Sequence, residues 1–158
     1  MKEIVVLLND IRSLHNVGSI LRTADAAGVS RIYLCGITPA PVDRFGKIRP
    51  QLAKVSLGAE KTVPWESVRA SEEIKLIKEL KRGGYKILSV EQSKKSVPYF
   101  KFKSTGKIAL IMGNEVKGLP KNILKISDEI LEIPMRGRKE SLNVSVAFGI
   151  AIFGLLYK

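Results

Sequence analysis

The stretch Ile108–Pro120, IALIMGNEVKGLP, decides the fold because it joins a buried strand directly to a polar loop. Its first five residues, Ile108–Met112, are all apolar, as is typical of a strand covered on both faces of a parallel sheet. The polar, glycine-containing segment Gly113–Pro120 follows at once. Because ligands of open α/β sheets bind beyond the carboxyl ends of the strands, this stretch predicts an α/β fold with a ligand site in the loop.

The rest of the chain alternates short apolar runs with segments of helical spacing. Four more strands are predicted at Ile4–Leu8, Ile32–Cys35, Lys86–Val90 and Ile130–Ile133. Helices are predicted over Asn16–Ala27 and Ser71–Arg82, each followed by glycine, while residues 44–54 are interpreted as a loop. This alternation predicts an α/β domain with a mostly parallel sheet flanked by helices. A length of 158 residues suits one domain covering residues 1–158.

The final segment, Ser141–Lys158, is apolar on nearly every side of a helix. A helix on the surface of a monomer would keep one polar face, so this one is expected to be covered on both sides. In so small a domain, the second cover is predicted to be another subunit in a homodimer. The apolar stretch Leu142–Tyr157 is interrupted by polar residues and is shorter than the ~20 residues that span a bilayer, so no membrane association is expected.

Composition favours a polyanionic partner. The chain has 27 Lys and Arg against 15 Asp and Glu, a net charge of +12, so RNA, DNA or an anionic membrane would each suit it. Cys35 is the single cysteine, lies in an apolar run and cannot form an intramolecular disulfide, which favours a cytoplasmic protein with an inert core thiol. The apolar run Ile4–Leu8 is too short for the core of a signal peptide.

Several familiar chemistries lack their motifs. No strand is followed by a G-x-G-x-x-G dinucleotide loop, and the sequence contains no G-x-x-x-x-G-K-[ST] phosphate loop. With one His and one Cys, neither a metal site nor a Cys-His dyad is expected, and His15 is interpreted as a loop residue.

Three polar segments each follow a predicted strand directly: Asn9–Arg22, Gly113–Pro120 and Pro134–Asn143. We expect them to converge on one site, because carboxyl ends of parallel strands meet at one edge of a sheet.

These segments carry a specific resemblance. Asn16–Ala24 (NVGSILRTA), Met112–Leu119 (MGNEVKGL), and Ile133–Met135 (IPM) with Ser141–Ala147 (SLNVSVA) resemble the three motifs of the SpoU family, RNA ribose 2′-O-methyltransferases of the SPOUT superfamily. The motifs occur in the family's order and cover nearly the whole chain. The resemblance implies an α/β knot, in which the carboxyl-terminal helix is tucked through a loop as a trefoil knot. Unlike many relatives, this chain is expected to have no separate RNA-binding domain.

The resemblance also implies roles for individual residues. The implied catalytic residues are Asn16, Arg22, Glu115, Ser141 and Asn143. The implied contacts of the cofactor, S-adenosyl-L-methionine, are Ser89, Val90, Glu91, Gly113, Ile133, Met135, Ser141 and Leu142. The expected RNA contacts, which include basic residues outside the motifs, are Asn16, Arg22, Arg44, Lys47, Arg49, Arg136 and Arg138.

Some of these residues have a plainer interpretation as well. Asn16 could be the N-cap of the first helix, and one of Ser141 and Asn143 could cap the last one. Glu115 could be a structural carboxylate paired with an arginine. For Arg22, a guanidinium is effectively always protonated, which argues against a base. We expect it to grip a phosphate of the substrate and to stabilise the developing oxyanion.

Three functions remain open at this point. The first is transfer of a methyl group from S-adenosyl-L-methionine to a ribose 2′-hydroxyl in tRNA or rRNA, as the resemblance implies. The second is a non-enzymatic basic protein that binds RNA or assists ribosome assembly with the same fold. The third is methylation of a base or of a small molecule.

Overall fold

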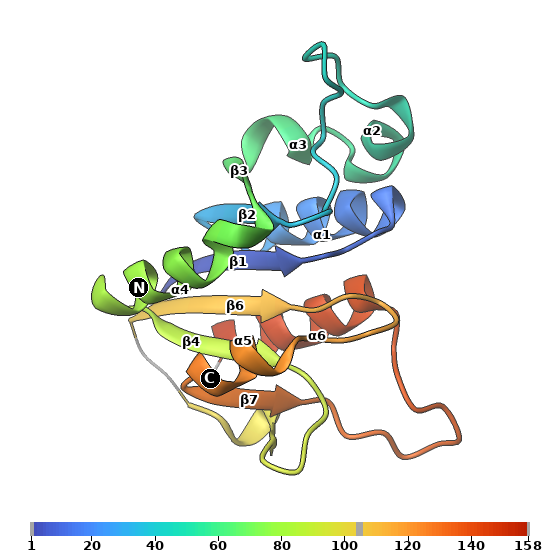
Figure 1. The fold of residues 1–158 in the computed structure, drawn as a ribbon. Coiled ribbons are helices and arrows are strands. Elements are labelled where there is room, and N and C mark those ends of the chain that lie inside the picture. Colours follow the sequence, from blue (N-terminus) through green and yellow to red (C-terminus); the bar gives the residue numbers. More distant parts are fainter. Residues whose placement is uncertain (1, 104–105, 158) are drawn as a thin grey trace.

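A seven-stranded parallel sheet forms the centre of the molecule (Figure 1). The computed structural model describes residues 2–103 and 106–157. The strand order is β3-β2-β1-β6-β4-β7-β5, and each of these pairs is parallel. The strands are β1 Glu3–Asn9, β2 Arg31–Cys35, β3 Trp65–Val68, β4 Lys86–Val90, β5 Val97–Pro98, β6 Lys107–Met112 and β7 Glu129–Glu132. The predicted parallel sheet flanked by helices is confirmed.

The five predicted strands correspond to β1, β2, β4, β6 and β7, within one or two residues at their ends. The two strands that the sequence did not reveal, β3 and β5, are the outermost strands of the sheet. Neither contains a fully buried residue, and β5 has only two residues. An edge strand that is covered on few sides needs no continuous apolar run, so nothing in the sequence marked them.

Helices cover both faces of the sheet (Figure 1). The helices are α1 Leu14–Ala26, α2 Pro50–Ser56, α3 Ala59–Thr62, α4 Glu73–Arg82, α5 Lys121–Ile126 and α6 Val144–Leu156, with 3-10 turns at Ala70–Glu72 and Tyr99–Lys101. Helices α1 and α6 share one apolar core, which contains Ile20 and Phe148. Helices α4 and α5 share the core on the other face through Ile77 and Ile123.

Three predictions about helices need correction. The first helix begins at Leu14 and not at Asn16, and the last begins at Val144 and not at Ser141. The interpretation of residues 44–54 as a loop is wrong in its second half, where Pro50 opens α2, since proline suits the first helical turn. Lys158, predicted at the end of the last helix, lies outside the described residues.

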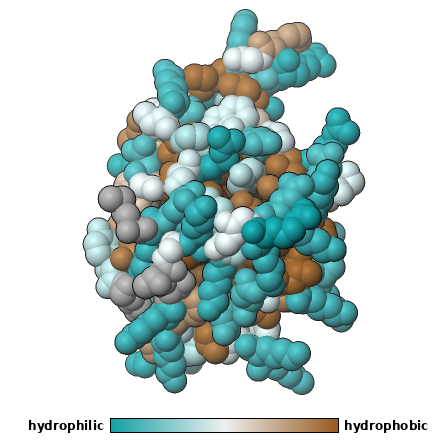
Figure 2. Space-filling view, turned by 90° about the vertical axis from the view of Figure 1, so that its left-hand side faces the viewer, coloured by the Kyte–Doolittle hydropathy of each residue, from teal (hydrophilic) through white to brown (hydrophobic). Residues whose placement is uncertain are grey.

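The central strands are buried on both faces, which explains their unbroken apolar sequences. In β1, every residue from Ile4 to Asn9 is buried, and successive side chains enter opposite cores. Val6 and Leu8 pack toward α1 and α6, whereas Val5 and Leu7 pack toward α4 and α5. The amino-terminal edge of the sheet is largely hydrophilic (Figure 2). A ligand site is expected at the opposite edge, because ligands of open parallel sheets bind beyond the carboxyl ends of the strands.

Helix α6 is covered on one side only within the chain. Its residues Val144, Phe148, Ala151, Ile152 and Leu155 are buried in the core. The other side carries a stripe at helical spacing, Val146, Ile150, Phe153 and Tyr157, hereafter the α6 stripe. Val146 is 50% exposed and Tyr157 is 82% exposed. The helix was expected to be buried on both sides, and this chain buries one of them. None of the helices in the described residues is both long and apolar enough for a membrane span.

Two buried polar groups lie under the carboxyl-terminal edge of the sheet. Cys35 is fully buried, as predicted, and burial raises the pKa of its thiol. Glu73, at the start of α4, is 4% exposed and accepts a hydrogen bond of 2.8 Å from Asn9 Nδ2. Among the described residues its second oxygen has no hydrogen-bond partner. Burial raises the pKa of Glu73, and the bond from Asn9 offsets this only in part.

The raised pKa of Glu73 predicts a stability that falls with pH. The protonated carboxyl is favoured in the folded state, so its contribution is complete below the unfolded pKa of about 4.3 and is lost as the pH rises through the folded value. We expect the free energy of unfolding of the wild type, relative to Glu73→Gln, to decrease over this interval and then to level off. Urea unfolding from pH 4 to 8 measures it. Glu72→Gln, at the neighbouring exposed carboxylate, controls for the lost charge, and a difference independent of pH would contradict the expectation.

Candidate active site

The three predicted loops meet at the carboxyl-terminal edge of the sheet, around one pocket of about 200 Å³. The loop after β6 and the loop after β7 form its walls, and the start of α6 closes it. Its lining residues are Val90, Glu91, Gln92, Met112, Gly113, Asn114, Glu115, Val116, Gly118, Glu132, Ile133, Met135, Ser141, Leu142, Val144 and Ala147. We call this the donor pocket. The loop after β1 reaches it through hydrogen bonds and not as a lining segment.

Glu115 ties the loop after β6 to the start of α1. Its carboxylate accepts hydrogen bonds from the backbone N–H of Arg12 and Ser13, both at 3.1 Å, and from Asn16 Nδ2 at 3.2 Å. Burial alone would raise the pKa of Glu115, but these donors outweigh it and leave the pKa below its usual value. Glu115 is therefore an ordering carboxylate whose partners are backbone and amide groups. The alternative of a pairing with an arginine side chain is not what this structure shows.

Asn16 connects Glu115 to the third motif. Besides its bond to Glu115, its side-chain oxygen accepts a hydrogen bond of 3.1 Å from Asn143 Nδ2. Its interpretation as the N-cap of the first helix is wrong, because Ser13 caps α1 by accepting from the N–H of Asn16. Asn16 is 6% exposed and both ends of its amide bind protein groups. The geometry gives it the role of positioning the site.

Asn143 serves two purposes at once. It caps α6, where its side-chain oxygen accepts hydrogen bonds from the N–H of Ser145 at 2.9 Å and from Ser145 Oγ at 2.6 Å. Its side-chain nitrogen meanwhile donates to Asn16. Ser141, two residues earlier, is exposed and lines the donor pocket. Of the two polar residues expected to begin the last helix, capping thus accounts for Asn143 alone.

Most of the residues predicted to hold a cofactor line the donor pocket, namely Val90, Glu91, Gly113, Ile133, Met135, Ser141 and Leu142. Ser89 does not. It is fully buried, and its hydroxyl lies 2.7 Å from that of Ser127 between β4 and β7. In a strand, consecutive side chains point to opposite faces. Because Val90 lines the donor pocket, Ser89 faces away from the pocket.

Glu91 and two glycines hold the loop after β6 close to the sheet. Glu91 Oε2 accepts a hydrogen bond of 2.9 Å from the N–H of Leu119. Gly118 has φ of +67° and lies so close to Glu91 that a Cβ would collide with its carboxylate. A Cβ on Gly113 would lie 2.8 Å from Leu119 Cγ and 2.9 Å from the carbonyl carbon of Gly118. The wall of the donor pocket thus depends on residues without side chains at these two positions.

The donor pocket has the chemistry for a cation with a flat apolar part. Three carboxylates, those of Glu91, Glu115 and Glu132, line it in a chain of net charge +12. Leu142 also lines it and is 39% exposed, which leaves an apolar surface for a ring to pack on. A sulfonium nucleoside combines a positive charge with an aromatic base, so these residues fit S-adenosyl-L-methionine. Among the described residues, no group of three or more His, Cys, Asp or Glu could hold a metal ion.

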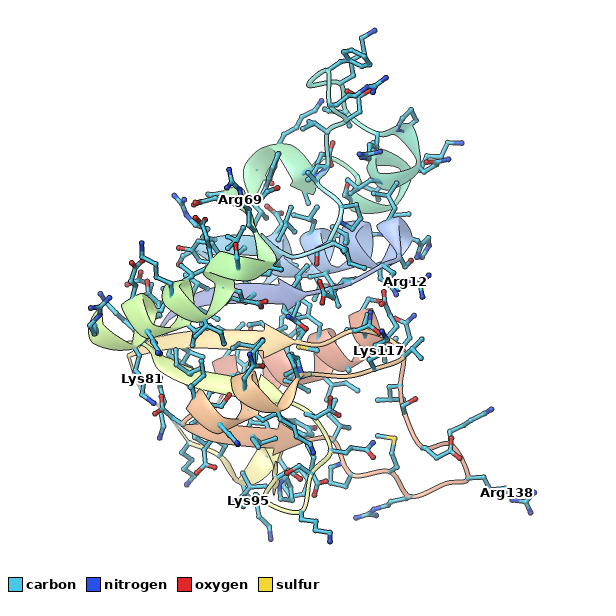
Figure 3. All side chains as sticks on the ribbon, in the orientation of Figure 1. Arg12, Arg69, Lys81, Lys95, Lys117 and Arg138 are labelled. Atoms are coloured by element: carbon cyan, nitrogen blue, oxygen red, sulfur yellow. The ribbon has the colours of Figure 1, made fainter. Side chains whose placement is uncertain are left out.

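Neither Arg22 nor the predicted basic residues outside the motifs line the donor pocket within one chain. Arg22 is exposed on α1 and is not among the lining residues. Six residues along a helix advance about 9 Å and turn about 240°, so Arg22 faces another side than Asn16. The basic residues form two separate groups, Arg44, Lys47 and Arg49 before α2, and Arg136 and Arg138 after β7. Their two loops lie at opposite ends of the molecule (Figures 1 and 3).

Sequence reasoning missed three residues of this network. Ser13, the N-cap of α1, was readable as a capping residue, whereas Ser145 lies inside α6 and donates to the cap Asn143. Arg12 contributes its backbone N–H, and because every residue except proline has this group, no signal in the sequence pointed to it.

Comparison with known proteins gives a consistent result. The model of the SpoU rRNA Methylase family matches residues 3–153. The chain is 36% identical over 151 residues to the 23S rRNA (guanosine-2'-O-)-methyltransferase RlmB of Ralstonia nicotianae, covering 95% of this chain and 57% of that protein. It is 32% identical to the tRNA (guanosine(18)-2'-O)-methyltransferase of Aquifex aeolicus, covering 96% of this chain and 68% of that one. The chain thus spans little more than half the length of the first of these relatives.

Solved structures agree with the sequence matches. An rRNA methyltransferase from Sinorhizobium meliloti, crystallised with bound AdoMet, superposes with a TM-score of 0.84 at 30% identity, covering 96% of this chain and 55% of that one. The tRNA-modifying enzyme TrmH/SpoU of A. aeolicus superposes with a TM-score of 0.83 at 32% identity, covering 98% of this chain and 74% of that one.

The packing at Gly113 gives a direct test of the loop. We expect Gly113→Ala to lower the free energy of unfolding by about 1–3 kcal/mol, because the added methyl group overlaps Leu119 and the backbone of Gly118. Gly137→Ala is the matched control, since a Cβ there meets nothing within 4 Å. Urea denaturation of both variants measures the difference. Equal stability of the two would show that the loop is not held as described.

Proposed function

Because the chain belongs to the SpoU rRNA methylase family, we propose that it transfers a methyl group from S-adenosyl-L-methionine to a ribose 2′-hydroxyl of tRNA or rRNA. The observation that carries the proposal is the chain of hydrogen bonds from Glu115 to Asn16 to Asn143. These residues come from the three family motifs and are far apart in sequence. A protein that only binds RNA would not need them joined beside a pocket with an acidic lining.

The donor would lie in the donor pocket. Its nucleoside would pack on Leu142 and Ile133, and the carboxylates of Glu91 and Glu132 would favour its positive charges. Bound there, it would supply a methyl group attached to a sulfonium sulfur. The neutral thioether that remains after transfer is a good leaving group. The loop held by Glu91 and Gly113 gives the pocket a fixed wall, so that donor and ribose oxygen can be aligned at little entropic cost.

Arg22 would act on the ribose and its neighbouring phosphate. A guanidinium stays protonated, and its planar fork matches two phosphate oxygens. In this role Arg22 grips the phosphate and stabilises the negative charge that develops on the 2′-oxygen as its proton leaves. The proton would pass to solvent or to a neighbouring group.

Arg22 would reach the donor pocket of a second subunit. Two residues of the α6 stripe, Val146 and Tyr157, are exposed in one chain, and a symmetric dimer built on this side of α6 would cover them. Helix α1 runs beside α6, where Thr23 would lie 3.9 Å from a Cβ on Gly149. Arg22, the residue before Thr23, is exposed on the same helix, so a partner that covers α6 would lie near it. A dimer would thus complete a site that one chain leaves without its arginine.

We also infer the trefoil knot of the family. Strand β7 lies beyond β4 on the side away from β6, whereas α6 packs in the core that contains β1 and β6 residues. The segment 133–143 therefore crosses the carboxyl ends of β4 and β6, next to the loop Gly113–Gly118 (Figure 1). Passage through that loop would make the donor pocket part of the knot. Single-domain organisation over residues 1–158 and a cytoplasmic location, where tRNA and rRNA are found, belong to the same proposal.

The function and the role of Arg22 are tested together. Purified protein should bind S-adenosyl-L-methionine in a calorimeter and form 2′-O-methyl nucleosides, read by mass spectrometry, on unmodified rRNA and tRNA transcripts. Arg22→Ala should keep donor binding and lower the rate at least 100-fold, in the range of one lost charge-stabilising group. Arg22→Lys should recover little of it, because a point charge lacks the fork.

The outcomes separate the alternatives. Failure to bind either the donor or its demethylated product would favour a non-enzymatic RNA-binding or ribosome-assembly protein. A methyl group found on the free base would move the reaction to a base. Full activity of Arg22→Lys would show that charge alone suffices.

The dimer is tested at the α6 stripe. The double change Val146→Glu and Tyr157→Glu, at the two exposed residues of the stripe, should convert a dimer to a monomer in sedimentation analysis, because it sets like charges in an apolar contact. Phe45→Glu, at an aromatic side chain that is 73% exposed elsewhere, is the control. Mixed subunits carrying Arg22→Ala and Glu115→Ala should regain about a quarter of the wild-type rate if the two residues meet across a symmetric dimer. No recovery in dimers that exchange subunits would place both in one chain.

A further inference from the structure

A second pocket lies on the other side of the loop Gly113–Gly118. Its volume is about 450 Å³, and its walls include Asn9, Asp10, Arg12, Ile37, Val116 and Lys117. We call it the flanking pocket. It shares Asn114, Val116 and Gly118 with the donor pocket, so one loop separates the two. The two pockets are therefore close enough for neighbouring parts of one ligand to reach both.

The floor of the flanking pocket is held in place by hydrogen bonds. Asn114 Nδ2 donates to the carbonyl oxygen of Asp10 at 2.6 Å, and Asp10 Oδ1 accepts from the N–H of Ile37 at 3.0 Å. Asp10 has φ of 50°, a left-handed conformation that few residues other than glycine adopt. Asn9 is bound to the buried Glu73 beneath it. Because hydrogen bonds join Asp10, Ile37 and Asn114, the floor of the flanking pocket is preformed and is not a loose gap between loops.

Two cations at the rim have no partner inside the protein. Arg12 and Lys117 form no ion pair within residues 2–103 and 106–157. Figure 3 shows both at the carboxyl-terminal edge of the sheet. Arg12 gives its backbone N–H to Glu115, which leaves its guanidinium available. Unpaired cations beside a concave surface favour a phosphate.

The rest of the lining suits a base better than a second phosphate. Ile37 is 64% exposed and Val116 is 82% exposed, which gives two apolar surfaces on which a flat ring can pack. The carboxylate of Asp10 would repel a free anion inside the pocket, but it can accept a hydrogen bond from an N–H of a base. The pocket volume lies in the range of sites for small ligands.

We propose that the flanking pocket binds a nucleotide of the RNA next to the one that is methylated, with its phosphate on Arg12 and Lys117 and its base between Ile37 and Val116. This inference rests on the proposed function, since it assumes an RNA substrate at the donor pocket. Residues of the flanking pocket would then contribute to the selection of the RNA substrate. The target nucleotide would then be selected together with its neighbour.

The first test is binding of a mixed-sequence RNA oligonucleotide, measured over a range of salt concentrations with S-adenosyl-L-homocysteine present. The double variant Arg12→Ala and Lys117→Ala should raise the Kd on the order of tenfold. It should also reduce the slope of log K against log salt by about 0.7 for each cation that contacts a phosphate. The matched control, Lys75→Ala with Lys78→Ala, removes two unpaired cations from α4 and should change the Kd less than twofold. Equal effects of the two double variants would overturn the proposal.

The second test reads the position of the base. The same oligonucleotide carrying 4-thiouridine is cross-linked to the protein by light, and the modified peptides are identified by mass spectrometry. Adducts at Ile37 or Val116 are expected, and adducts only elsewhere would overturn the proposal. Donor binding by the Arg12 and Lys117 variant should equal that of the wild type. If the wild type neither binds the donor nor methylates RNA, the proposed function fails; if it does both and the double variant matches it on RNA, only this inference fails.

Discussion

The site depends on the hydrogen bonds that the Glu115 carboxylate accepts. They join the loop after β6 to the start of α1, about a hundred residues away in sequence. The acceptors of Glu115 are filled by the backbone of Arg12 and Ser13 and by the amide of Asn16. An ionised carboxylate that accepts several N–H groups forms stronger bonds than a neutral acceptor would. Through Asn16 the same network reaches Asn143 and fixes the start of α6. One acidic side chain thus sets the relative position of all three motifs.

The proposed reaction also gives a reason for acidic residues at the pocket of a strongly basic protein. A cationic donor and an anionic RNA would bind side by side, so the surface would need both signs of charge within a short distance. Carboxylates line the donor pocket, while Arg12 and Lys117 stand at the rim of the neighbouring one. The loop Gly113–Gly118 separates the two environments. The close packing of this loop on Glu91 and Leu119 keeps the acidic and basic environments apart. Each proposed ligand would then have its own wall.

Helix α6 would link this chemistry to assembly in the proposed dimer. One side of it belongs to the core through Phe148 and Ile152, and its first turn is joined to the site through Asn143. The other side carries the α6 stripe, whose residues would be unfavourable in water if they stayed uncovered. Arg22 lies on α1, the helix that packs beside α6, and does not line the donor pocket, so in the proposed dimer the same contact would complete both assembly and catalysis. Assembly and catalysis would be coupled in this way because one helix, α6, is capped by Asn143 and carries the α6 stripe.

The sequence by itself determined the central strands, the fold class and the residues of the three motifs. Runs such as Ile4–Leu8 and Ile108–Met112 reveal themselves because strands covered on both faces must be apolar throughout. Only the tertiary structure decided what the polar residues do. Asn16 was open to interpretation as a cap until Ser13 was found in that position, and Ser89 faced away from the pocket that its neighbours line. Polar roles depend on partners distant in sequence, and hydrogen bonds to backbone groups leave no periodic pattern from which those partners could be predicted.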